Sequence, residues 1–193
     1  DVTDFGDELF GPNLNDYFGF EVAVADFDGD GIDELASVAD YSPAYGYVWS
    51  EAPTGSAAAD ADSWEFTFPS AHYGCNSGYS GPMSPGDVNG DGYADMLAAC
   101  PYGATSNGIA YLILGPLTGG GDMSTLAAAT TTGENYSTTA YLNEFGDLND
   151  DGYDDLALGA HGWDYGSFRD VGKMYIVYGP LSTSLDFSVD SAD

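Results

Sequence analysis

Basic residues are almost absent from this sequence. Its 193 residues include 32 acidic side chains, whereas the only Lys and Arg residues are Lys173 and Arg169, so the formal net charge is −30. Nucleic acids and anionic lipid surfaces attract proteins through clustered cations. A nucleic-acid partner is therefore excluded. The self-repulsion of such a chain also favours neutralisation by divalent cations, or screening by a high-salt environment.

Long apolar runs are also missing. No segment approaches the roughly 20 apolar residues of a membrane-spanning helix, and Asp1 does not begin an apolar leader. We expect no direct membrane insertion, and we expect a mature or excised part of a secreted, cell-surface protein. Cysteine is scarce as well. Cys75 and Cys100 predict one disulfide outside the cell, and two buried thiols are the alternative.

Aromatic residues and glycine, in contrast, are abundant. The chain has 15 Tyr, 10 Phe and 3 Trp among 27 Gly, and 44% of its residues are apolar. Disordered acidic segments contain few aromatic residues. The composition therefore predicts one compact, turn-rich β domain.

An Asp-rich loop recurs three times with a period of about 60 residues: loop 1 (26–34), loop 2 (87–95) and loop 3 (147–155). Each loop continues into a short apolar run, and a second strand-like run follows it. Helical periodicity is weak, and the runs are rich in Val, Ile, Tyr and Phe between Gly, Asn and Asp. The paired runs are 35–39 with 46–49, 96–100 with 110–114, and 156–160 with 174–178.

A repeat of this length has room for four strands, which is the size of one blade of a β-propeller. We therefore predict an all-β single repeat domain built from blades of four antiparallel strands, and a solenoid is the competing interpretation. Because three blades do not close a ring, we expect either a longer chain or copies joined head to tail. The predicted blades are 18–78, 79–138 and 139–193, with 1–17 as an outer strand of a preceding or neighbouring blade.

The loops have the ligand pattern of calcium sites. Calcium binds about six to eight oxygen atoms, and a glycine at position 6 permits the sharp turn. Positions 1, 3, 5 and 9 supply side-chain oxygens, and position 7 supplies a backbone carbonyl. We expect about three Ca²⁺ ions, one per loop. The predicted ligands are Asp26, Asp28, Asp30, Ile32 and Glu34; Asp87, Asn89, Asp91, Tyr93 and Asp95; and Asp147, Asn149, Asp151, Tyr153 and Asp155.

Three other interpretations of these loops are weaker. An EF-hand needs a Glu at position 12 and flanking helices, but position 12 here is Ser37, Ala98 or Leu158. An ordinary solvated turn explains one Asp-Gly cluster but not three matched copies. Magnesium seldom occupies an all-protein cage.

The loops and their flanks resemble the FG-GAP repeats of integrin α-subunit β-propellers and of related bacterial and archaeal surface proteins. Phe18-Gly19 matches the Phe-Gly that precedes the loop, and 159–161, 98–101 and 38–40 are degenerate forms of the Gly-Ala-Pro that follows it. The resemblance implies that each repeat is a blade, that the loop joins its first two strands, and that position 9 is the last side-chain ligand. It also implies extracellular recognition, adhesion or architecture without catalysis.

The sequence is compatible with three functional classes. The first is a non-catalytic, calcium-binding structural or adhesion module, such as a repeating subunit of a surface filament, whose partners are other proteins or its own copies. The second is a glycan-binding lectin, suggested by aromatic residues in loop-like stretches. The third is a polysaccharide hydrolase that uses two carboxylates. Asn135 opens a glycosylation sequon. The aromatic residues are Tyr41, Tyr45, Tyr47, Trp64, Tyr73, Tyr79, Trp163 and Tyr165.

Overall fold

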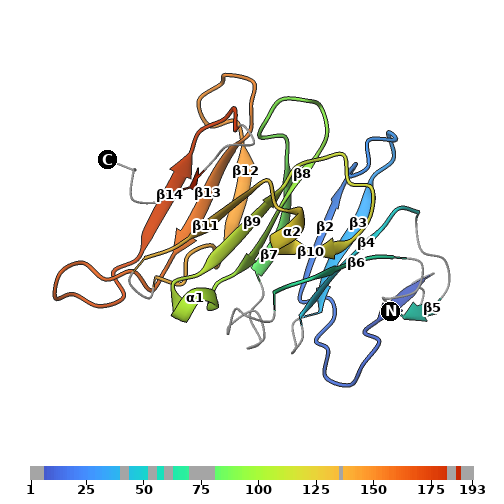
Figure 1. The fold of residues 1–193 in the computed structure, drawn as a ribbon, viewed down its shortest axis with the longest axis horizontal. Coiled ribbons are helices and arrows are strands. Elements are labelled where there is room, and N and C mark those ends of the chain that lie inside the picture. Colours follow the sequence, from blue (N-terminus) through green and yellow to red (C-terminus); the bar gives the residue numbers. More distant parts are fainter. Residues whose placement is uncertain are drawn as a thin grey trace, which may run out of the picture.

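A computed structural model gives the fold of the described chain as three larger β-sheets that lie side by side along the long axis of the molecule, with a fourth, two-stranded sheet (Figure 1). We call the three larger sheets blades 1, 2 and 3. The prediction of an all-β chain with antiparallel sheets is confirmed. The structure describes residues 7–39, 44–51, 56–58, 63–69, 81–134, 137–181 and 186–187.

Blade 1 is an antiparallel meander of four strands to which a later segment adds a fifth, parallel strand at the outer edge. Loop 1 is the hairpin connection between its first two strands. In order from the inner edge, the strands are β2 (Glu21–Ala25), β3 (Glu34–Ala39), β4 (Tyr45–Trp49), β6 (Trp64–Thr67) and β10 (Gly121–Asp122).

Blade 2 repeats this arrangement, including the parallel fifth strand at its outer edge. Its strands are β7 (Gly81–Gly86), β8 (Asp95–Cys100), β9 (Ile109–Ile113), β11 (Ala129–Thr132) and β15 (Asp186–Phe187). Two short helices, α1 (Gly103–Ser106) and α2 (Met123–Leu126), lie in its connections.

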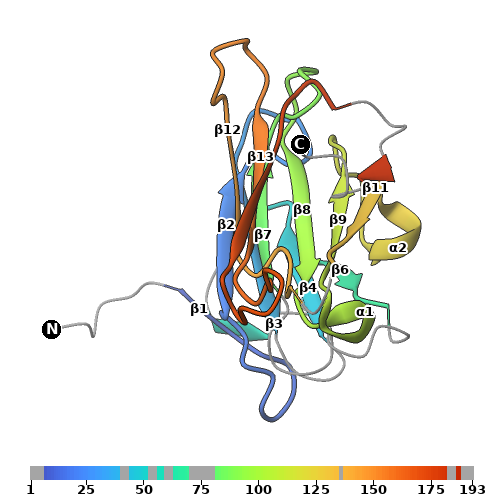
Figure 2. The same cartoon turned by 90° about the vertical axis from the view of Figure 1, so that its left-hand side faces the viewer.

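Blade 3 has three described strands in antiparallel order, β12 (Asn143–Gly146), β13 (Asp155–Ala160) and β14 (Lys173–Val177). The inner strands β2, β7 and β12 are neighbours, as Figure 2 shows from the side. From the segment 1–17, β1 (Glu8–Phe10) pairs in parallel with β5 (Ser56–Ala58) in a separate sheet beside blade 1.

Two apolar layers of the core lie between neighbouring blades, and a smaller third cluster of buried Ala39, Tyr47 and Trp49 belongs to blade 1. In β8 every side chain is buried, because successive residues point to opposite faces and blade 2 has a neighbour on both sides. Met96 thus packs in the layer toward blade 1, whereas Leu97 packs in the layer toward blade 3. In β14 the pattern alternates instead, so that Tyr175 is buried and Met174 is exposed. One face of blade 3 is therefore open.

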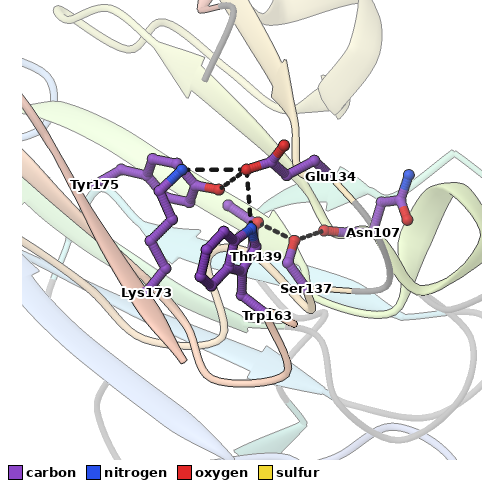
Figure 3. A network of polar contacts seen from close by, with 7 residues as sticks. All are labelled: Asn107, Glu134, Ser137, Thr139, Trp163, Lys173 and Tyr175. Atoms are coloured by element: carbon purple, nitrogen blue, oxygen red, sulfur yellow. Dashed lines mark hydrogen bonds and ion pairs between the residues drawn. The ribbon is translucent and has the colours of Figure 1, made fainter. Parts of the chain in front are cut away.

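Glu134, which follows β11, ties blade 2 to blade 3 (Figure 3). Its Oε1 atom accepts hydrogen bonds from Trp163 Nε1 at 3.0 Å, Tyr175 OH at 3.0 Å and Lys173 Nζ at 3.1 Å. The Lys173 ammonium also lies 4.3 Å from the centre of the Tyr175 ring. Charge-assisted bonds of this kind are stronger than neutral ones. One of the two cationic side chains of the sequence thus acts at a junction between blades.

Several residues that the sequence analysis singles out lie outside the described parts of the chain. Cys100 is buried at the end of β8, but Cys75, its predicted disulfide partner, lies outside the described residues, and so do Asn135, Tyr41, Tyr73 and Tyr79. Neither short helix of the described chain approaches the length or the apolar character that crossing a membrane requires.

Candidate calcium loops

The three loops lie at the same end of the sheets, at the top of Figures 1 and 2. Each closes an antiparallel hairpin, because the residue before the loop pairs with position 9: Ala25 with Glu34, Gly86 with Asp95, and Gly146 with Asp155. Strands rather than helices flank every loop, so the EF-hand arrangement does not apply.

The Asp at position 1 shapes each loop by accepting hydrogen bonds from backbone amides of the same loop. Asp26 accepts hydrogen bonds from Gly29 N at 2.7 Å and from Gly31 N at 3.0 Å. Asp87 and Asp147 make the corresponding bonds to Gly92 and Gly152, each at 2.9 Å. The three position-6 glycines have φ between +89° and +92°, a conformation that side chains with a Cβ rarely adopt. Local turn chemistry therefore folds the loops as the sequence predicts.

Loop 1 brings three carboxylates together. Oxygen atoms of Asp26, Asp28 and Glu34 lie within 4.8 Å of one another. Among the described residues, no other group of three His, Cys, Asp or Glu side chains has ligand atoms as close together. Glu34 is only 2% exposed, and its Oε1 atom has no hydrogen-bond partner. A buried carboxylate oxygen without a donor is costly. A calcium ion fits this donor set, because it binds oxygen and neutralises clustered charge.

Loops 2 and 3 differ from loop 1 at position 3. They carry Asn89 and Asn149, whose Nδ2 atoms donate to Oδ2 of Asp91 and Asp151, each at 2.9 Å. In all three loops the side-chain oxygen at position 3 accepts the amide of position 5. The side chains at position 5 in turn accept the amides of position 7, as Asp30 does from Ile32 at 2.8 Å. The full ligand set of fifteen residues remains a prediction, of which the structure gathers Asp26, Asp28 and Glu34 most closely.

Three acidic side chains of the loops have shifted pKa values. Burial raises the pKa of Asp95 to about 6, and the charges of Asp91 and Asp87 add to this, although amide donors act in the opposite direction. Burial likewise raises the pKa of Glu34, with a further contribution from Asp28. At the exposed Asp147, hydrogen bonds led by that from Gly152 N lower the pKa.

Contacts between successive loops were not foreseen from the sequence. The Tyr93 ring packs on Gly29 of loop 1, and the Tyr153 ring packs on Gly90 of loop 2, where an added Cβ would lie 2.3 and 2.2 Å from ring carbons. The only sequence signal is that loops 2 and 3 share Tyr at position 7, whereas loop 1 has Ile32.

Position 8 of loop 3 makes a second contact between loops. Asp154 Oδ2 accepts the amide of Asp87 at 2.8 Å, and the amide of Asp154 donates to the carbonyl of Asp87 at 3.0 Å. Loop 2 is thus held by the loop of the next blade. Loop 2 itself has Ala94 at position 8, and therefore offers loop 1 no carboxylate at this position.

Comparison with known families agrees with the blades and their hairpin loops. Residues 26–98 match the FG-GAP-like repeat family, and residues 144–177 match the FG-GAP repeat family. The chain belongs to the FG-GAP repeat family. The predicted resemblance to FG-GAP repeats is thereby confirmed.

Two relatives of this FG-GAP chain are integrin α-subunits. Integrin alpha-PS2 of Drosophila melanogaster is 28% identical over 171 residues, which cover 81% of this chain and 12% of that protein. Integrin alpha-IIb of Mus musculus is 30% identical over 170 residues, which cover 80% of this chain and 16% of that protein. The chain thus spans a small part of the length of the relatives that it matches.

Proposed function

We propose that this chain is a calcium-binding, non-catalytic structural or adhesion module that acts outside the cell. The observation that carries the proposal is loop 1, where three carboxylates converge beside a buried oxygen that has no donor. Binding of calcium to the folded state alone would stabilise that state by mass action. The net charge of −30 makes neutralisation by about three ions favourable.

A calcium titration tests the first part of this proposal. We expect EDTA to lower the melting temperature, and added Ca²⁺ to restore it, whereas Mg²⁺ at the same ionic strength should restore much less. Isothermal titration calorimetry should find about three bound ions. An unchanged melting temperature in EDTA would defeat the proposal.

The extracellular and adhesive role is supported by the family and by the named relatives, which are integrin α-subunits. A disulfide between Cys75 and Cys100 would suit that location. Its test is the mass change on alkylation with and without prior reduction. Free thiols in the unreduced protein would contradict it.

Other protein surfaces are the proposed partners, and a second copy of the chain is one of them. The open face of blade 3 exposes Met174 and Tyr178, and the outer face of blade 1 exposes Val22 and Val24. The opposite faces of blades 1 and 3 pack against blade 2, which supports a blade of another copy as a partner for the open faces. Light scattering at increasing concentration tests the assembly of copies.

The lining of the pocket beside blade 1 does not favour catalysis by a pair of carboxyl groups. The pocket of about 350 Å³ beside blade 1 is lined by Leu9, Phe18, Val22 and Leu35, with Asp7 as its one carboxylate. Hydrolysis of a glycosidic bond ordinarily needs two carboxyl groups across the substrate. The test is the release of reducing sugar from a polysaccharide panel, and any turnover would contradict the proposal.

Glycan binding is the alternative function. Most described aromatic residues suggested for it contribute to packing: Tyr47 is buried, Trp64 packs against the layer between blades 1 and 2, and Trp163 packs against the layer between blades 2 and 3. Tyr165 is exposed and contacts Trp163 with a ring separation of 5.8 Å. A glycan array with a Tyr165→Ala control would support this alternative if binding depended on that ring.

A further inference from the structure

Position 9 is held by backbone amides in loops 2 and 3. Asp95 accepts Val88 N through Oδ2 and Gly115 N through Oδ1, both at 2.9 Å. Asp155 accepts Leu148 N and Gly179 N in the same way, both at 2.8 Å. Each carboxylate oxygen in these two buried side chains therefore has a donor without any ion.

Loop 1 lacks the second of these donors. Glu34 accepts Phe27 N at 2.7 Å and Asp28 N at 3.1 Å through the same atom, Oε2, which leaves Oε1 without a partner. Loop 1 is therefore the loop in which a buried charge is incompletely satisfied by the protein itself.

The strand that follows explains this difference. In blade 2, Ile113 pairs with Met96, and Gly115 lies two residues after Ile113. In blade 1, Trp49 pairs with Leu35, and the residue two positions after Trp49 is Glu51. A Cβ on Gly115 would lie 2.6 Å from the Ala94 carbonyl oxygen, and one on Gly179 would lie 2.8 Å from the Asp154 carbonyl oxygen. Only glycine can approach so closely, so Glu51 cannot place its amide in the same way.

From these contacts we infer that the three loops depend unequally on calcium, an inference that rests on the proposed calcium binding. Loop 1 needs the ion to complete the bonding of Glu34 and to neutralise Asp26 and Asp28. Loops 2 and 3 keep their conformation through Asp95 and Asp155 when calcium is withdrawn. Calcium removal thus opens blade 1 first, so this blade is the part of the module that responds to calcium concentration.

Hydrogen exchange of the full chain, in Ca²⁺ and in EDTA, tests this inference. Exchange reports local opening segment by segment. In EDTA we expect amides in 26–39 to exchange about tenfold faster or more, equivalent to about 1.4 kcal/mol of local stability. Those in 87–100 and 147–160 should be accelerated by a clearly smaller factor, which reflects only the ion that each loop releases when it opens. Equal acceleration in the three segments, or the largest effect in loop 2 or 3, would overturn the inference.

A matched pair of variants separates the two roles of position 9. Glu34→Gln keeps an oxygen for the amides of Phe27 and Asp28 but removes the charge, so protection of 26–39 in EDTA should persist while the gain on adding Ca²⁺ disappears. Asp95→Asn leaves one acceptor oxygen for two amides, so protection of 87–100 should fall both with and without calcium. If Glu34→Gln loses protection equally in both conditions, the inference is wrong.

The failure of the underlying proposal would look different. If Ca²⁺ changes neither the melting temperature nor exchange in any loop, then calcium binding itself fails and the inference fails with it. If Ca²⁺ protects all three loops to the same degree, calcium binding stands and only the unequal dependence is rejected. Should one variant not fold, the comparison of the wild-type segments decides alone.

Discussion

At the scale of single residues, the contact between Tyr153 and Gly90 joins loop 3 to loop 2. Gly90 has φ of +74°, and Gly92 has φ of +89°, but only at Gly90 would a Cβ meet the Tyr153 ring. We expect Gly90→Ala to lower the free energy of unfolding by about 2–4 kcal/mol, the sum of backbone strain and overpacking. Gly92→Ala should cost about 1–2 kcal/mol, because it introduces the strain alone. Equal effects in urea unfolding would show that the contact contributes nothing.

The lowered pKa of Glu134 predicts that the stability of the folded state depends on pH. Burial would raise its pKa, but hydrogen bonds from Lys173, Tyr175 and Trp163 outweigh burial and lower the pKa below 4.5. A lowered pKa in the folded state contributes stability that is present above pH 4.5 and is lost as the pH falls through the folded value. Glu134→Gln should therefore cost about 1–3 kcal/mol at pH 7 and progressively less below the ordinary carboxyl pKa.

Asp164 provides the control for this experiment. It pairs with Arg169 at 3.6 Å, but the Arg169 side chain is 85% exposed. Exposed ion pairs contribute at most about 1 kcal/mol. Asp164→Asn should thus have a small effect when both variants are compared with the wild type by thermal unfolding at pH 7 and at lower pH. If the effect of Glu134→Gln does not shrink at low pH, the network is not acting through the charge of Glu134.

At the scale of elements, the inner strands β2 and β12 carry two carboxylates, Glu21 and Glu144, whose charges repel each other. Burial, with a smaller contribution from Glu144, raises the pKa of Glu21 to about 7. The folded state then binds a proton more tightly than the unfolded state, so stability falls as the pH rises from 4.5 to about 7. Glu21→Gln should raise the melting temperature at pH 8 and leave it nearly unchanged at pH 4.5.

The neighbouring carboxylate supplies a comparison for Glu21. Because burial is the larger cause, Glu144→Gln should reproduce only part of the gain in melting temperature at pH 8. A Glu21→Gln protein that melts at the wild-type temperature at pH 8 would show that Glu21 is not kept from water as the fold indicates.

Elements also differ in how readily the sequence predicts them. The hairpins around the three loops follow from local chemistry, since Asp and Gly form the turn and an apolar strand follows. The parallel pairing of β10 with β6, and of β15 with β11, could not be predicted in this way. These are two-residue pairings whose partners come from other repeats, and nothing in Gly121-Asp122 specifies the edge that it joins.

Assembly is a property of the whole molecule, and its open faces allow a test. If blade 3 of one copy packs on blade 1 of the next, Ile176→Asp and Val24→Asp should each reduce the molar mass measured by light scattering to that of a monomer. A buried charge without a partner is costly at such an interface. Leu148→Asp is the control, because Leu148 is exposed on loop 3 rather than on either face and is not a predicted calcium ligand. A wild-type protein that stays monomeric at all concentrations would contradict assembly.

By itself, the sequence determined the repeat of about 60 residues, the position of the three acidic loops and the short apolar runs that follow them. These depend on residues close together in the chain, such as Asp87 with Gly92, whose bonding is local. Only the tertiary structure decided that Glu34 keeps an unpartnered oxygen while Asp95 does not, and that Glu134 receives three donors from blade 3. The reason is physical: those donors come from strands and blades that meet only when the chain is folded.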